Sequence, residues 1–135
     1  MSELAIRQIF EARLEAWAKQ KPLCVKFENK RLPKEPQGLY LRTKLLNAPA
    51  QAADIVGEET AFVGVFSIDI MGVPDKGAKE AGEAIAALRQ LFPCFEVTKT
   101  AAVSITQMTP LQVATAQEDG DHYMVPTSFQ YTALG

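Results

Sequence analysis

The sequence has little of the chemistry on which metal sites and many enzymes depend. It contains one histidine, His122, and two cysteines, Cys24 and Cys94, which have no C-x-x-C spacing. These residues cannot supply a recognisable structural zinc set, which needs about four Cys or His ligands at short spacings. Both cysteines lie beside apolar residues, so we expect buried free thiols. We therefore expect neither a metal nor a cofactor.

Long hydrophobic runs are also missing. No apolar stretch approaches the roughly 20 residues that a membrane-spanning helix requires. The first residues, MSELAIRQIFEARLEAW, mix charged with apolar side chains, which argues against a signal or transit peptide. We therefore expect no membrane partner and a cytosolic start. The chain of 135 residues, 47% of them hydrophobic and 22% charged, suits one domain with one core, which we place over residues 1–135.

A complete phosphate-binding loop is absent. IDIMGVPDKGAKEAGEAI, residues 68–85, has the order strand, glycine-bearing loop and helix, but a Walker loop also requires lysine and a hydroxyl residue directly after its last glycine. Here Gly77 is followed by A-K-E, and Pro74 removes one backbone donor. We therefore assign the glycines to the exit from a strand, with Asp75 as the helix cap.

The segment EDGDH, residues 118–122, contains residue types found in catalytic and metal sites. Acidic residues around a glycine are also common in exposed turns, and we interpret the segment as a turn. Asp69 is a carboxylate inside an apolar strand, which a subunit contact explains as well as chemistry does. We assign no catalytic residue. A polar pocket that joins His122 with Asp121 or Asp69 would instead indicate an enzyme or a small-ligand domain.

Side-chain periodicity predicts two helices and several strands. A helix over residues 3–20 places apolar residues at three- and four-residue steps, and a second helix over residues 75–91 stops before Pro93. Alternation predicts strands at residues 23–29, 39–46, 60–71 and 122–133, a hairpin in FEVTK and AAVSITQM, and a short strand in LQVATAQ. Residues 47–59 form a long connection, which is often functional or disordered.

Two residues qualify the strand predictions. Gly64 indicates a bulge or a close backbone approach within residues 60–71. Pro126 cannot donate to a strand ladder, so we expect the last strand to be an edge or to carry a bulge there. The element order predicts an α+β fold: a mainly antiparallel, mixed sheet of about five to six strands, with two helices packed on one face.

The net charge of −2 hides an asymmetry along the chain. Residues 19–44 contain eight basic and two acidic residues, whereas residues 45–135 contain four basic and eleven acidic residues. Such a split favours head-to-tail association of identical chains. A nucleic-acid surface is an alternative, in which Lys30, Arg31 and Lys34 would make the contacts, but the basic stretch has few interleaved aromatic residues. The charges are also compatible with simple solvation.

The whole pattern resembles one family. The stretches SELAIRQIFEARLEAWA, VKFEN, LYLRTKLL, GVFSIDIMGVPDKGAKEAGEAIAALRQLFP and YMVPTSFQY are similar to small phage and prophage proteins related to the tail terminators of long-tailed phages such as lambda. The resemblance runs over nearly the whole chain. Its motifs are helix faces, strand alternation and the proline after the second helix, which are structural features.

This resemblance implies an α+β fold and a role without catalysis. Tail terminators of this kind form a hexameric ring on the tail tube, stop its polymerisation and present a surface to the head. The implied partners are further copies of the chain, the tail tube protein and a head-completion or connector protein, without direct nucleic-acid binding. The implied location is the host bacterial cytoplasm during assembly and then the virion tail. Whether the isolated chain is a monomer stays open.

The candidate subunit interface follows from the charges and the polar strand faces. The last strand offers Ser128 and Gln130, and residues 60–71 offer Ser67 beside Asp69. The candidate interface residues are Arg42, Lys44, Glu58, Glu59 and Asp69. Alternatives are a head–tail joining adaptor or minor tail protein, a small-ligand-binding or enzymatic α+β domain, and a nucleic-acid-binding domain.

Overall fold

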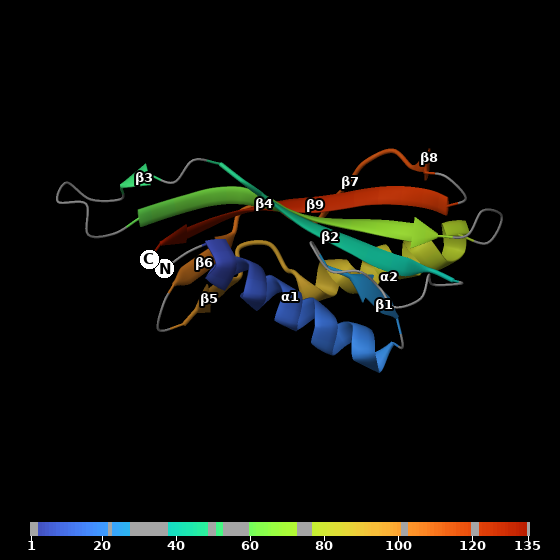
Figure 1. The fold of residues 1–135 in the computed structure, drawn as a ribbon, viewed down its shortest axis with the longest axis horizontal. Coiled ribbons are helices and arrows are strands. Elements are labelled where there is room, and N and C mark those ends of the chain that lie inside the picture. Colours follow the sequence, from blue (N-terminus) through green and yellow to red (C-terminus); the bar gives the residue numbers. More distant parts are fainter. Residues whose placement is uncertain are drawn as a thin grey trace.

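Two helices lie on one side of a long twisted sheet (Figure 1). The computed structural model describes residues 3–21, 23–27, 38–48, 51–52, 60–72, 77–100, 103–119 and 122–134. The helices are α1 (Glu3–Gln20) and α2 (Gly77–Leu91). The strands are β1 (Cys24–Lys26), β2 (Tyr40–Asn47), β3 (Gln51–Ala52), β4 (Thr60–Gly72), β5 (Val97–Lys99), β6 (Ser104–Gln107), β7 (Gln112–Val113), β8 (Gln117–Asp119) and β9 (His122–Leu134).

The sheet is mixed but mostly antiparallel, as the sequence predicts. Its main order is β1-β2-β4-β9-β6-β5, and β3, β7 and β8 attach to β4 or β9. Among the described strands, β1 and β2 pair in parallel and all other pairs are antiparallel. The two long strands β4 and β9 pair without a break, from Ala61 opposite Leu134 to Gly72 opposite Tyr123. These two strands form the centre of the sheet, and the expected α+β class is confirmed.

The core lies between the helices and one face of the sheet. Ile6, Phe10 and Leu14 of α1 are buried, as their helical spacing predicts. The alternating residues of β4, Phe66, Ile68 and others, face them. Five aromatic rings cluster where α1 crosses the long strands, with centroid separations of 5.1–6.2 Å: Phe10, Phe66, Phe92, Phe129 and Tyr131.

Arg13 ties α1 to the edge strand β5. Its Nη2 donates to Thr98 Oγ1 at 2.9 Å, and its Nη1 lies 2.5 Å from Glu96 Oε1. Its guanidinium carbon lies 5.4 Å from the centre of the Phe92 ring, within the range of a cation–π contact. These contacts fix β5 beside the helix layer, although β5 has only three residues.

The element boundaries differ from the predictions mainly at strand ends. The predicted strand at 23–29 is the shorter β1, and residues 28–29 lie outside the described residues. The predicted connection at 47–59 contains β3, and its residues 49–50 and 53–59 lie outside the description. The short strand predicted in LQVATAQ is replaced by β7 and the start of β8, both paired with β9.

The prediction for Pro126 was wrong. Strand β9 is central, and its register with β4 carries no bulge. The carbonyl oxygen of Pro126 accepts a hydrogen bond from the N–H of Ala114 at 2.9 Å. Because a strand residue directs its N–H and C=O to the same side, the missing donor faces the irregular stretch between β7 and β8. The proline therefore costs no ladder bond with β4.

Thr43 offers a stability test inside the core. Its side chain is 4% exposed, and its hydroxyl has no hydrogen-bond partner among the residues that the structure describes. Because an unpaired buried hydroxyl is costly, we expect Thr43→Val to raise the free energy of unfolding by about 1 kcal/mol in urea denaturation. Thr127 is the matched control: it is equally buried, but its hydroxyl donates to the Ile68 carbonyl, so Thr127→Val should destabilise by about 1–2 kcal/mol. Equal effects of the two substitutions would contradict this account.

Candidate assembly surfaces

Both described helices lie on one face of the sheet, and neither covers the opposite face (Figure 1). We call it the outer face. Alternation places Arg42, Lys44 and Leu46 of β2 on it, because Leu41, Thr43 and Leu45 are buried toward the helices. The same face carries the odd-numbered residues of β4, up to Ser67 and Asp69. It also carries the even-numbered residues of β9.

One half of the outer face is rich in apolar and β-branched side chains, although its rows also include Gln130 of β9 and Lys99 of β5. Val63 of β4 lies opposite Thr132 of β9. On the other side of β9, Thr132 lies opposite Thr106 of β6. Thr106 in turn lies opposite Val97 of β5. A row of β-branched side chains thus crosses four strands. The adjoining rows add Leu46 opposite Val65, and Ala61 opposite Leu134. We name the apolar members of these rows the outer patch: Leu46, Ala61, Val63, Val65, Val97 and Leu134.

The outer patch is exposed to an extent that single surface residues do not explain. Val63 is 48% exposed, Leu46 46%, Leu134 47% and Val97 51%. Strands β7 and β8 pair with the other half of β9, residues 122–128, so they leave this half uncovered. Scattered apolar surface residues are normal, but a contiguous patch marks a contact site. The geometry therefore suits docking of another protein.

The other half of the outer face is charged, and it contains three of the candidate interface residues. Arg42 and Asp69 stand opposite each other in the β2–β4 register, and Arg42 Nη2 lies 3.2 Å from Asp69 Oδ2. The same nitrogen lies 3.2 Å from Met124 Sδ on β9. Lys44 is exposed opposite Ser67. The structure thus brings together two residues that the sequence offered separately, whereas Glu58 and Glu59 lie outside the described residues.

The Arg42–Asp69 pair explains the carboxylate within β4. The side chains are 38% and 20% exposed, so solvent screens the pair and its net contribution to stability is about 0–1 kcal/mol. Its effect is local: the two charges neutralise each other on one chain. Lys44 forms no ion pair with any residue that the structure describes.

Of the residues suspected of catalytic or metal chemistry, the structure describes Asp69 and the backbone of Asp119 and His122. Asp119 pairs with His122 in the β8–β9 hairpin, and residues 120 and 121 lie outside the description. Asp69 pairs in register with Pro126, four residues along β9 from His122, which is roughly 13 Å. No group of three metal-ligating side chains occurs among the residues that the structure describes. Likewise, no helix in the described ranges is long and apolar enough to span a membrane.

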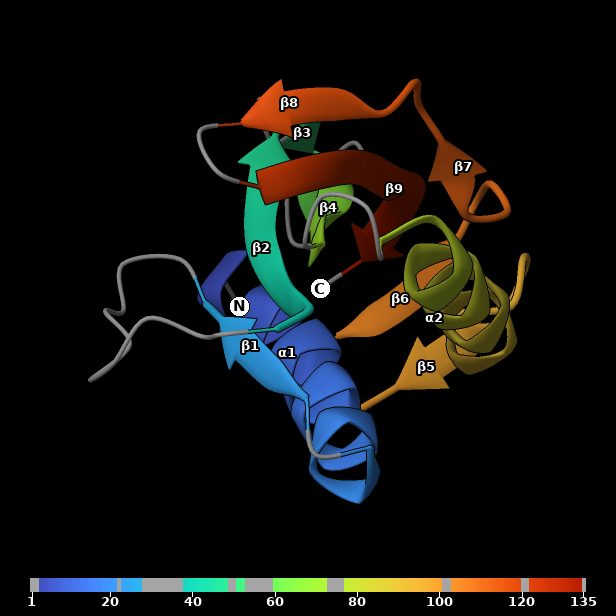
Figure 2. The same cartoon turned by 90° about the vertical axis from the view of Figure 1, so that its right-hand side faces the viewer.

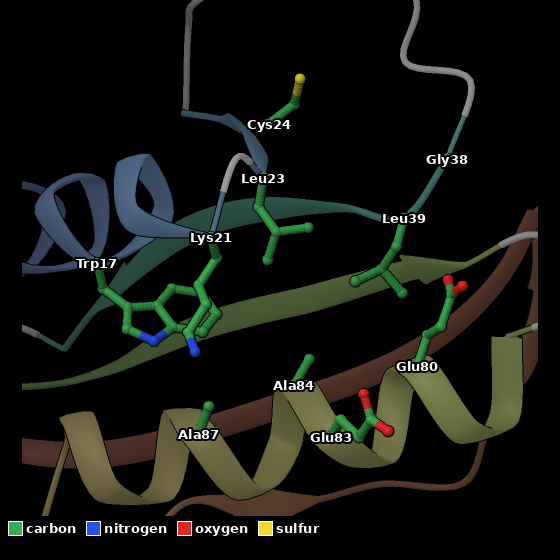
Figure 3. A pocket seen from close by; sticks show the side chains of 10 residues that line it. All are labelled: Trp17, Lys21, Leu23, Cys24, Gly38, Leu39, Glu80, Glu83, Ala84 and Ala87. Carbon is green, nitrogen blue, oxygen red and sulfur yellow. The ribbon is translucent and has the colours of Figure 1, made fainter.

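The expectation of buried thiols was wrong for Cys24. Both cysteines are free, but Cys24 is exposed and Cys94 is only half-buried. Cys24 begins β1, a three-residue strand at the edge of the sheet, and its side chain points away from the neighbouring apolar residue Leu23 (Figure 3). Apolar neighbours in sequence predicted burial poorly here, because successive residues of an edge strand point to opposite sides.

The fold defines a class: an α+β domain in which α1 and α2 lie on one face of a mixed, mostly antiparallel sheet. Residues 5–131 match the family model described as phage tail terminator protein, so the chain belongs to the family of phage tail terminator proteins. A solved structure whose title states no function is 28% identical, with a TM-score of 0.82, over 98% of this chain and 96% of its own. Among curated proteins no significant match is found.

Proposed function

We propose that this protein is a structural component of a phage or prophage that forms a ring, as a hexamer, on the end of the tail tube. The ring stops polymerisation of the tube and presents a surface for joining to the head. The protein acts in the host bacterial cytoplasm during assembly and remains in the virion tail. Membership of the tail terminator family supports the tube as a partner.

The observation that carries this proposal is the outer patch. Its half-exposed apolar side chains form the kind of core that protein interfaces bury, and the neighbouring charged half has the character of a rim. We assign the patch to the end of the tail tube. We assign the contacts between copies to the candidate interface residues, which are Arg42, Lys44, Glu58, Glu59 and Asp69.

A tube-length assay tests the proposal. Purified tail tube protein would be polymerised with and without this protein, and tube lengths would be measured by electron microscopy. Wild-type protein should shorten the tubes and appear at their ends. Val63→Glu places a charge in the middle of the outer patch, and we expect it to raise the concentration needed for capping at least about tenfold.

Leu4→Glu is the matched control for that experiment. Leu4 is also an exposed apolar residue, 57% exposed, but it lies on α1, behind the covered face of the sheet. It should cap tubes like wild type. Tubes of unchanged length with wild-type protein would contradict the terminator role. Binding to heads without any effect on tubes would instead support a head–tail joining adaptor.

A further inference from the structure

A strained turn between α2 and β5 carries an exposed aromatic ring. Phe95 has a φ of 63°, and its side chain is 69% exposed. Among the described residues other than glycine, Phe95 alone has a positive φ. A Cβ atom is crowded in this left-handed region, which glycine enters freely. The turn therefore holds a large apolar side chain in water at a position that favours glycine.

Two hydrogen-bonding motifs impose this conformation. The N–H of Glu96 donates to the Pro93 carbonyl oxygen at 3.4 Å, so residues 93–96 form a β-turn, and the positive φ at its third residue is typical of type II. The N–H of Phe95 donates to the Gln107 carbonyl oxygen at 2.8 Å, and the N–H of Gln107 donates to that of Glu96 at 3.1 Å. Two residues thus oppose one, which is a β-bulge of the type whose first residue is usually glycine.

Neither the backbone nor the core explains a phenylalanine at this position. Glycine would satisfy both motifs without crowding. The ring adds little to the core, because it is 69% exposed whereas the nearby Phe92 is 1% exposed. A strained residue that the fold does not need points to a function, and aromatic side chains are enriched in the cores of protein interfaces. Phe95 therefore has the properties of a binding residue.

The turn adjoins the outer patch at the β5 corner of the sheet. Val97, which belongs to the patch and is 51% exposed, follows Phe95 by two residues. Strands β5 and β6 lie side by side (Figure 2), and the bulge joins the turn to Gln107 at the end of β6. The exposed ring thus lies next to a surface that is already assigned to docking.

Met108 connects the same turn to the centre of the patch. Gln107 is buried, and its amide donates to the Phe92 carbonyl oxygen beside the end of α2, so alternation places Met108 on the outer face. Met108 is 41% exposed, and its N–H donates to the Gln130 carbonyl oxygen at 2.8 Å. Gln130 lies opposite Val65 on the other side of β9. Met108 therefore continues a row of the outer patch up to the turn that carries Phe95.

We propose that Phe95 is an anchor of the contact with the tail tube, and that its ring is buried against an apolar site of the tube protein when the outer patch docks on the tube end. This inference rests on the proposed function and names a specificity-determining residue of that contact. The occupant is the tube because the turn continues the surface assigned to it. The residues assigned to contacts between copies, Arg42, Lys44 and Asp69, lie in the charged half of the outer face.

The first test uses the opposite effects that this proposal predicts for stability and docking. Phe95→Gly should raise the urea concentration at the midpoint of unfolding, because it relieves the crowding of the Cβ atom. The same change should raise the protein concentration needed to shorten tubes at least about tenfold, because it removes the anchor. Phe95→Asn should act in the same direction, since asparagine also tolerates a positive φ.

Two controls accompany these variants. Phe95→Tyr keeps an aromatic ring and should cap tubes within about twofold of wild type. Leu4→Ala removes an exposed apolar side chain from α1, away from the outer face, and should cap like wild type. Unchanged capping by Phe95→Gly would overturn the anchor role. A lowered urea midpoint for Phe95→Gly would also overturn it, because the ring would then be needed by the fold itself.

The second test identifies the molecule that the ring meets. The full-length variant Phe95→p-benzoylphenylalanine carries a photoreactive ring at this position and would be irradiated in solution and on tube ends. We expect a cross-link to the tube protein that forms only when tubes are present, and none from the same group introduced at Leu4. Cross-links to a second copy of the chain, or no cross-link on capped tubes, would contradict the proposal.

The outcomes separate this proposal from the proposed function. Shortened tubes with wild-type protein and equal capping by Phe95→Gly would remove only the anchor. A cross-link from position 95 to the tube protein without any shortening of the tubes would keep the anchor and remove the terminator role. Neither shortening nor a cross-link would remove both.

Discussion

Replacing Phe10 by alanine is expected to lower the free energy of unfolding by about 3–5 kcal/mol. Phe10 is 3% exposed at the centre of the aromatic cluster. Its ring centre lies 5.1 Å from that of Phe66, 5.2 Å from Phe129 and 5.5 Å from Tyr131. Truncation therefore leaves a cavity bounded by α1 and both long strands.

The measurement is urea denaturation followed by circular dichroism. A loss of this size is a large fraction of the roughly 5–15 kcal/mol that stabilises a domain, so the variant should unfold at a much lower urea concentration. Leu4→Ala is the control, because Leu4 lies on the same helix but is 57% exposed, and it should change stability by less than about 0.5 kcal/mol. Similar curves for the two variants would contradict the packing of α1 against the sheet.

Replacing Gly64 by alanine is expected to destabilise the chain by about 3 kcal/mol, although the change adds one methyl group. A Cβ atom there would lie 2.5 Å from the Leu46 carbonyl oxygen and 2.6 Å from the Tyr131 hydroxyl. The first is backbone, and the second belongs to a fully buried ring whose hydroxyl donates to Asn47 Oδ1 at 3.1 Å. Neither neighbour can move without losing other contacts.

Gly64 also matters for the outer patch, because it lies between Val63 and Val65 in β4. We expect Gly64→Ala to weaken tube capping as well as stability, since β2 must shift away from β4. Gly82→Ala is the matched control: no described atom beyond its own stretch of helix lies within 4 Å of its added Cβ, and within α2 the change should stabilise by about 0.5–1 kcal/mol. Destabilisation by Gly82→Ala, or tolerance of Gly64→Ala, would refute this reading of the two glycines.

The Tyr131→Phe change separates the two clashes. Adding it to Gly64→Ala removes the contact with the hydroxyl but leaves the contact with the Leu46 carbonyl oxygen. The double variant should therefore recover only part of the lost stability. Full recovery would mean that the backbone of β2 is free to adjust, which the alternating ladder with β4 argues against.

The sequence by itself determined the elements of this protein. The spacing of Ile6, Phe10 and Leu14 defines α1, and the alternation along residues 60–71 defines β4, because the periods of helices and strands follow from backbone geometry alone. The α+β class followed from the order of these elements. Gly64 was expected to mark a bulge or a close approach, and the structure shows the close approach.

Only the tertiary structure decided which surfaces exist. Arg42 and Asp69 are 27 residues apart, and the β2–β4 register places them opposite each other. The local sequence around either residue does not predict that register. The prediction for Pro126 was wrong for the same reason. Strand order decides which segment lies beside the position where Pro126 lacks a backbone N–H. The exposure of Val63 depends on which sheet face the helices cover and how they sit over it. Local periodicity fixes where side chains point, but only long-range packing fixes what they meet.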